Sequence, residues 1–157
     1  MALWYFICFI ACVYLNTSIF DYKKRRYQPF KWEENGKWYE KHLYIKKWKD
    51  KLPQHIGKDG FSKANFKSTS IEYIDEFIME TCRGEWNHSL NCFFIVIILA
   101  IIPSLISILF SILTLLINIP FIVIQRYNRF RLIKIKNTKI QFELKNKSKK
   151  SKEPKIN

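Results

Sequence analysis

The stretch LNCFFIVIILAIIPSLISILFSILTLLINIPFIVI, residues 90–124, decides the fold of this chain. Its 35 residues include no Asp, Glu, Lys, Arg or His. A globular core mixes apolar and polar residues at helix or strand period, so an unbroken apolar run of this length is typical of a bilayer segment. Residues 2–20 form a second uncharged run. This segregation excludes a soluble single domain, although the mean hydropathy of −0.14 is ordinary. The length of 157 residues excludes a large multidomain enzyme.

The long apolar run is too long for one membrane helix. A straight helix of its length would measure about 52 Å, whereas a bilayer core is ~30 Å thick. Pro103 and Ser104 supply a break. We expect a helical hairpin with a short or tilted first limb over residues 90–102 and a full-length second limb over residues 104–124. A re-entrant first limb is the alternative.

The charges predict the orientation. Residues 21–89 carry 15 basic and 11 acidic side chains, and residues 126–157 carry 12 basic and 2 acidic ones. Basic clusters directly follow both apolar runs, so the positive-inside rule places the N-terminus outside and both charged segments in the cytoplasm. We therefore predict a multi-pass protein of a bacterial-type plasma membrane, with its active region on the cytoplasmic face.

The predicted fold class is an all-α integral membrane protein with an N-terminal transmembrane helix, cytoplasmic amphipathic helices and a C-terminal membrane hairpin. The expected divisions are an anchor at 1–20, an interfacial helical region at 21–89, the hairpin at 90–125 and a basic cytoplasmic tail at 126–157. The tail's end, residues 145–157, is expected to be disordered and leaflet-associated. The first run lacks a basic n-region and a small-x-small cleavage site, which favours an uncleaved anchor over a signal peptide.

The cysteine and histidine spacings indicate neither a metal site nor a disulfide. Cys8 and Cys12 lie one helical turn apart in the first run, and Cys82 and Cys92 flank the start of the second. There is no CxxC motif, and the three histidines show no HExxH spacing. We expect buried thiols that behave as small hydrophobic groups, with no disulfide and no metal.

Residues 31–51 interleave aromatic side chains with lysines. Trp38, Ile45, Trp48 and Leu52 recur at spacings of 7, 3 and 4, which predicts an amphipathic helix with a cationic opposite face. Trp and Tyr favour the headgroup level and lysines favour an anionic leaflet. The pattern also suits single-stranded nucleic acid. Apolar runs on both sides of the segment favour the membrane surface, so we expect membrane lipids as partners and no nucleic acid.

A second cytoplasmic helix is expected to start at a capping box formed by Thr69 and Glu72. Just before the long apolar run it carries a group of polar residues: Glu80, Thr81, Arg83, Glu85, Asn87 and His88. At about 100° per residue, these form two adjoining strips, with Glu80, Arg83 and Asn87 on the first and Thr81, Glu85 and His88 on the second. They either form a site at the membrane entrance or only staple the helix end, by pairing Glu80 with Arg83 and Glu85 with His88.

A third polar block directly follows the apolar run: Gln125, Arg126, Tyr127, Asn128 and Arg129. Arginines after a span commonly snorkel and set topology. A hairpin would return this block to the same membrane face as His88, which makes a shared site geometrically possible.

Three blocks together resemble the glycosyl-4,4'-diaponeurosporenoate acyltransferase family, the last enzyme of staphyloxanthin-type carotenoid synthesis. They are Gly36-Lys37-Trp38 running on to Tyr44-Ile45-Lys46-Lys47-Trp48-Lys49-Asp50-Lys51-Leu52-Pro53, then Glu80-Thr81-x-Arg83-x-Glu85-x-x-His88, then Gln125-Arg126-Tyr127-Asn128-Arg129. The similarity covers about residues 36–132. The family usually has proline where this chain has Phe130, and alanine where it has Gly84.

The resemblance implies transfer of a fatty acyl group to the 6-hydroxyl of a glucose on a long apolar carotenoid acid, with acyl-CoA or acyl carrier protein as donor and no bound cofactor. We predict His88 as general base, oriented by Glu85. Arg83, positioned by Glu80, would act with Arg126 and Arg129 to bind the donor's phosphates or stabilise the oxyanion. The other predicted substrate- or donor-binding residues are Gln125, Asn128, Lys47 and Trp48.

Two other functions stay open: an acyltransferase acting on another glycolipid, and a non-catalytic lipid-binding membrane scaffold.

No Cys or Ser has an obvious base neighbour, which favours direct transfer over an acyl-enzyme on Cys82. The His-x-x-x-x-Asp pattern of glycerolipid acyltransferases is absent, because the corresponding positions hold Lys47, Gly60 and Phe93. The sequence gives no oligomeric state.

Overall fold

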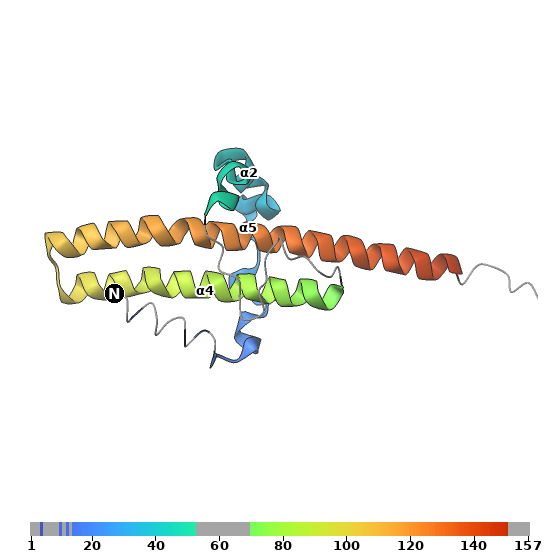
Figure 1. Cartoon of the computed structure of the whole chain (residues 1–157), viewed down its shortest axis with the longest axis horizontal. Coiled ribbons are helices and arrows are strands. Elements are labelled where there is room, and N and C mark those ends of the chain that lie inside the picture. The colour runs from blue at the N-terminus through green and yellow to red at the C-terminus, as the bar shows by residue number, and fades with distance from the viewer. Residues whose placement is uncertain (1–3, 5–9, 11, 13, 53–69, 151–157) are drawn as a thin grey trace, which may run out of the picture.

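Two long helices dominate the computed structural model, which describes residues 4, 10, 12, 14–52 and 70–150. Helix α4 (Ile71–Ile101) and helix α5 (Leu105–Lys150) run side by side and are joined at one end (Figure 1). Ile102, Pro103 and Ser104 are non-helical and form the connection. The break that the sequence predicted at Pro103 is therefore present, and the two apolar limbs form a hairpin.

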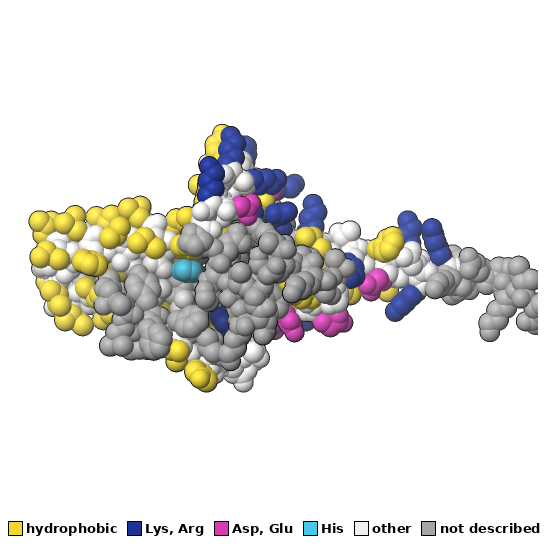
Figure 2. Space-filling model, viewed as in Figure 1, with side chains coloured by type: hydrophobic (Ala, Val, Ile, Leu, Met, Phe, Trp, Pro, Cys, Tyr) yellow, Lys and Arg dark blue, Asp and Glu magenta, His cyan; other side chains and the backbone are white. Residues whose placement is uncertain are grey.

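The outer surface of the hairpin is apolar near this connection (Figure 2). Large hydrophobic side chains of both helices are exposed there, among them Phe93, Ile101, Leu105, Leu109 and Leu116. Both helices are long and apolar enough to cross a membrane, and their most apolar windows are only 11% and 17% buried. The core helix of a soluble protein would be mostly buried, so the exposed apolar sides fit a hairpin that faces lipid.

The helices extend beyond the predicted limits of the hairpin. Helix α4 passes without interruption through the boundary expected at residue 89, and α5 through the one expected at residue 125. The N-cap of α4 is Ser70, whose hydroxyl accepts a hydrogen bond from the Tyr73 amide at 3.1 Å. The predicted cap, Thr69, lies outside the described residues. Residues 145–150 were expected to be disordered, but they belong to α5; the rest of the tail lies outside the described residues.

Residues 17–52, which we call the collar, wrap around the middle of the hairpin (Figure 1). The collar consists of short helices: η1 (Thr17–Phe20), η2 (Arg25–Tyr27), η3 (Lys31–Gly36), α2 (Lys37–His42), α3 (Ile45–Trp48) and η4 (Lys49–Lys51). Its start packs on α4 through η1, and η3 packs on α5. The single amphipathic helix predicted over residues 31–51 is wrong, because Tyr44 adopts a left-handed backbone conformation (φ 48°) that separates α2 from α3.

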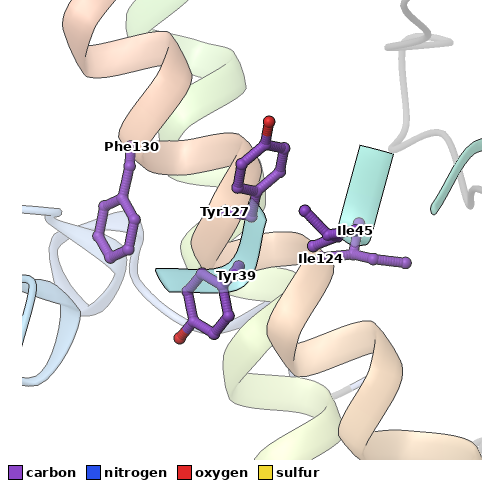
Figure 3. Close-up of a cluster of buried hydrophobic side chains, with 5 residues drawn as sticks. All are labelled: Tyr39, Ile45, Ile124, Tyr127 and Phe130. Atoms are coloured by element: carbon purple, nitrogen blue, oxygen red, sulfur yellow. The ribbon is translucent and has the colours of Figure 1, made fainter. Parts of the chain in front are cut away.

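Small hydrophobic clusters attach the collar to the hairpin. The cluster in Figure 3 joins collar residues to one face of α5: Tyr39, Ile45, Ile124, Tyr127 and Phe130. A second cluster packs Phe20 and Tyr27 against Cys82 of α4. Gly36 has φ +95°, and a Cβ there would lie 3.3 Å from Cδ2 of Phe130. Glycine at this position therefore permits both the left-handed turn and the close approach of the collar to α5.

The described residues of the first apolar run lie along α4. Trp4 stacks on Phe94 with ring centroids 3.9 Å apart, and the Cys12 sulfur is 3.9 Å from Oδ1 of Asn87. Trp4 and Cys12 therefore follow α4 in the opposite chain direction. Cys12, Cys82 and Cys92 are not in disulfides, and Cys8 lies outside the described residues. The uncleaved anchor stays a prediction.

Candidate functional site

Four charged side chains form a buried network, which we call the ion network, between the collar and both long helices. Arg126 on α5 donates from Nε to Glu33 of η3 at 2.6 Å and from Nη1 to Glu85 of α4 at 2.8 Å. Arg129 donates from Nη2 to the other oxygen of Glu85 at 2.5 Å. Glu33 and Arg129 are fully buried, and Arg126 is 6% exposed. Two cations face two carboxylates, and this balance is what such deep burial of charge requires.

A left-handed turn holds Glu33 in the ion network. Glu34, Asn35 and Gly36 all have positive φ, so the chain reverses directly after Glu33. The Glu33 carboxylate also accepts hydrogen bonds from the Phe30 amide at 2.6 Å and from the Tyr39 hydroxyl. Burial alone would raise the pKa of Glu33, but these donors, led by Arg126, hold it below its ordinary value. Burial and the neighbouring Glu33 carboxylate raise the pKa of Tyr39.

The two arginines of the ion network are occupied by the protein itself. Arg126 also donates to Oε2 of Glu33 at 2.7 Å and to the backbone carbonyls of Arg26 and Gln28 at 3.3 and 3.0 Å. Arg129 has no exposed surface. The geometry therefore does not support the prediction that Arg126 and Arg129 bind donor phosphates or an oxyanion. They fasten the collar to the hairpin.

His88 is hydrogen-bonded to Asn118 and not to Glu85. Its Nδ1 lies 2.9 Å from Oδ1 of Asn118 on α5, and its ring stacks on Phe121 with centroids 4.9 Å apart. Both oxygens of Glu85 are taken by arginines. The prediction that Glu85 orients His88 is thus wrong in this structure, and Asn118 takes that place. Asn118 is a residue that the sequence reasoning missed.

Asn118 ends a polar stripe on the inner face of α5, which we call the polar seam. Its members are buried and spaced by four, three and four residues: Ser107, Ser111, Thr114 and Asn118. From α4, the amide nitrogen of Asn91 donates to Oδ1 of Asn118 at 3.3 Å. Small polar residues let membrane helices approach closely. Asn118 precedes Arg126 by eight residues, so it lies roughly 12 Å closer to the hairpin connection along α5 than Arg126 does.

Gln125 and Asn128 lie on the same side of α5 as the ring that stacks on His88. Phe121, Gln125 and Asn128 follow one another at spacings of four and three, which place them on one helix face. The Gln125 side chain lies over Gly84, where a Cβ would be 2.9 Å from its Cδ and Nε2. Among the described residues its amide has no hydrogen-bond partner. These two predicted site residues are therefore aligned with His88.

The remaining predicted site residues lie elsewhere. Arg83 pairs with Glu80 at 2.5 Å, as predicted, and its guanidinium lies 5.2 Å from the centre of the Phe20 ring. This pair faces the start of the collar. Lys47 lies over the Tyr44 ring, and the Trp48 indole donates to the Leu43 carbonyl at 2.8 Å. No contact among the described residues joins these four side chains to His88.

A groove of about 450 Å³ opens beside the ion network. Aromatic and apolar side chains form most of its walls, and charged ones the rest: Phe30, Trp32, Trp38, Tyr39, Leu43, Ile122, Val123, Arg26, Glu85 and Arg126. Ile122 and Arg126 share the α5 face that borders it, about 100° around the helix from Phe121 and the His88 ring. The groove and His88 therefore occupy different sides of the contact between α4 and α5.

Comparison with known proteins identifies relatives of this chain. Residues 23–138 match the family described as glycosyl-4,4'-diaponeurosporenoate acyltransferase. A Staphylococcus aureus protein of that name, from strain USA300, is 30% identical over 127 residues, covering 77% of this chain and 76% of its own length. The protein of the same name from strain MRSA252 is 28% identical over 123 residues, covering 77% and 74%. No solved structure matches the chain.

Proposed function

The chain belongs to the glycosyl-4,4'-diaponeurosporenoate acyltransferase family, and from that premise we propose that it esterifies the sugar 6-hydroxyl of a glycosylated carotenoid acid with a fatty acyl group. The membrane hairpin supports an acceptor of this kind, because a long apolar body can lie in the bilayer beside α4 and α5. The observation that carries the proposal is an imidazole held between the two long helices by Asn118 and Phe121, with its second ring nitrogen without a partner. Among the described residues, Nε2 of His88 has no hydrogen-bond partner.

In the proposed reaction, Nε2 of His88 takes the proton of the sugar hydroxyl as its oxygen attacks the carbonyl of an acyl thioester. The new C–O bond forms, the C–S bond breaks, and the proton passes from the imidazole to the departing thiolate. The unpartnered amide of Gln125, which lies over Gly84 one turn before His88 on α4, is the proposed donor to the developing oxyanion, with Asn128 one turn further along α5. The donor is acyl-CoA or acyl carrier protein, and we place the reaction on the cytoplasmic face.

Direct transfer suits the site better than an acyl-enzyme. Cys82, the least unsuitable nucleophile of the sequence, is fully buried among Phe20 and Tyr27, and its sulfur lies 3.7 Å from Nη1 of Arg129. A substrate carbonyl cannot reach a thiol in that position without displacing the collar. The lysines of the collar and tail are proposed to contact the anionic leaflet.

The test is mass spectrometry of pigment and lipid extracts from a host that supplies the glycosylated carotenoid acid. Cells expressing the wild-type chain should gain a product heavier by one fatty acyl group, and cells expressing His88→Gln should not. His42→Gln, a histidine of α2 outside the hairpin, is the matched control and should behave as the wild type. Product in His88→Gln cells would remove His88 from the mechanism. Acylation of a different glycolipid would reassign the acceptor, and no acylated lipid at all would favour the scaffold.

A further inference from the structure

The polar seam holds the His88 ring through a chain of hydrogen bonds that ends on the backbone of α5. The amide nitrogen of Asn118 donates to the Thr114 carbonyl at 2.9 Å. The amide oxygen of Asn118 faces Nδ1 of His88 at 2.9 Å and the amide nitrogen of Asn91 at 3.3 Å. Asn118 is 1% exposed and Asn91 3% exposed, so both amides are enclosed between the helices.

The Thr114 carbonyl sets the orientation of the Asn118 amide. If the amide were flipped, its oxygen would face the Thr114 carbonyl oxygen. Two acceptors would then oppose each other in a buried setting, where an unmet hydrogen bond costs about 1–3 kcal/mol. The oxygen of Asn118 therefore points at His88, and an oxygen of this kind can only accept.

Because Asn118 presents an acceptor, Nδ1 of His88 must carry the hydrogen. A neutral imidazole has one N–H and one lone pair, so the lone pair is on Nε2. Resting on the proposed function, we propose that Asn118 is the positioning residue of this enzyme. It fixes the His88 tautomer in which Nε2 is the base, and with the Phe121 stack it fixes the plane of the ring. Asparagine orients the histidine of some cysteine-protease triads in the same manner.

The chemistry of the location explains why an amide performs this task instead of a carboxylate. On α5, Asn118 lies roughly 12 Å nearer the hairpin connection than Arg126, and on α4, His88 lies about 4.5 Å nearer to it than Glu85. A second ionised group there would add a charge to be buried, whereas an amide supplies the same acceptor without one. Glu85, one turn away on α4, is the available carboxylate, and its oxygens are consumed by Arg126 and Arg129.

The test reads the tautomer directly and does not depend on turnover. The full-length chain, labelled with ¹⁵N-histidine and held in lipid nanodiscs, is measured by ¹⁵N NMR, with the His88 signals assigned by their loss in His88→Gln. The wild type should show a protonated Nδ1 and a bare Nε2. Asn118→Leu should shift hydrogen toward Nε2, and Asn118→Asp, which keeps an oxygen in place, should retain the wild-type pattern. Asn137→Leu is the matched control on an exposed turn of the same helix.

Kinetics supply the second readout. Asn118→Leu should lower kcat by roughly 100-fold or more while leaving KM for the acceptor within a few-fold, and Asn118→Asp should recover part of kcat. Asn118→Ala replaces the leucine variant if the latter does not fold. Three outcomes would each overturn the proposal. The wild type could have a bare Nδ1, or the tautomer could be unchanged in both the leucine and the alanine variants. A normal kcat in a variant with a shifted tautomer is the third. A locked tautomer in a wild type that transfers no acyl group would preserve Asn118's role in fixing the ring and refute the proposed reaction.

Discussion

Removal of the Glu33 charge should release the collar from the hairpin. Glu33 is fully buried and accepts two hydrogen bonds from Arg126, at 2.6 and 2.7 Å, and one each from the Phe30 amide and the Tyr39 hydroxyl. In Glu33→Gln, the ion network would hold two arginines against one carboxylate. Loss of one partner of a buried ion pair costs about 3–5 kcal/mol, because the remaining charge stays buried without compensation.

Hydrogen exchange of the collar amides measures this cost. The Leu43 amide donates to the Tyr39 carbonyl and the Lys47 amide to the Tyr44 carbonyl, so both report opening of the collar. A loss of 3–5 kcal/mol corresponds to roughly two to four orders of magnitude faster exchange, since each 1.4 kcal/mol is a factor of about ten. Glu34→Gln is the matched control, because Glu34 is the adjacent residue and is exposed. Acceleration of less than tenfold, or an equal effect of Glu34→Gln, would refute the assignment of the ion network as the collar's attachment.

Three further outcomes follow from the same contacts. Because the pKa of Glu33 is lowered, its contribution to the stability of the collar is complete above the ordinary glutamate value of 4.5 and is lost as the pH falls below it. The free energy of opening the collar should therefore decline in acid. Glu33→Gln should largely remove that pH dependence. Gly36→Ala should destabilise the collar by about 1–3 kcal/mol, from strain at positive φ and contact with Phe130, which thermal unfolding in nanodiscs would detect. Gly84→Ala should be tolerated and should add up to about 1 kcal/mol of helix stability, because only the flexible end of Gln125 has to move; a loss of thermal stability would contradict this.

The hairpin was predictable because its signals are local. An uncharged run interrupted by Pro103 encodes two apolar helices and a break, and the structure has both. The residues at which each helix starts and ends were harder to predict from the sequence. Between residues 71 and 101 the composition changes from amphipathic to apolar, and this change marks a new environment, not an end of the helix. Gly84 alone does not break α4, since glycine inside a helix costs only about 1 kcal/mol.

The collar was mispredicted because its backbone depends on long-range contacts. The spacing of Trp38, Ile45 and Trp48 fits one helix face, yet Tyr44 between them is left-handed. Such a conformation in a residue other than glycine has a cost of order 1–3 kcal/mol, which packing elsewhere must offset. The cluster of Tyr39 and Ile45 with Tyr127 on α5 provides that packing, and it joins residues more than 80 positions apart in the chain. No local pattern contains this information.

For the candidate site, the structure contradicts two predicted pairings: Glu85 does not contact His88, and Arg126 and Arg129 are engaged by carboxylates of the protein. The sequence reasoning placed His88, Gln125 and Asn128 together, and the structure brings Gln125 and Asn128 into line with His88. It missed Asn118, although an amide inside an apolar run is a recognisable signal of an interior-facing position. It also missed Glu33, because adjacent Glu33 and Glu34 look equally exposed until Arg126, 93 residues later, is placed beside the first of them.

The misassigned partners have one physical origin. A sequence displays its cations and carboxylates separately, so Arg126 and Arg129 looked like free positive groups suited to phosphates. The fold pairs them with Glu33 and Glu85, so that all four charges are engaged in buried ion pairs. Among the described residues, the groups that we place around His88 are neutral: the amides of Asn118 and Gln125 and the Phe121 ring. Neutral groups suit the base that we propose, because a fixed neighbouring charge would hold the imidazole in one protonation state, whereas an amide constrains only its direction.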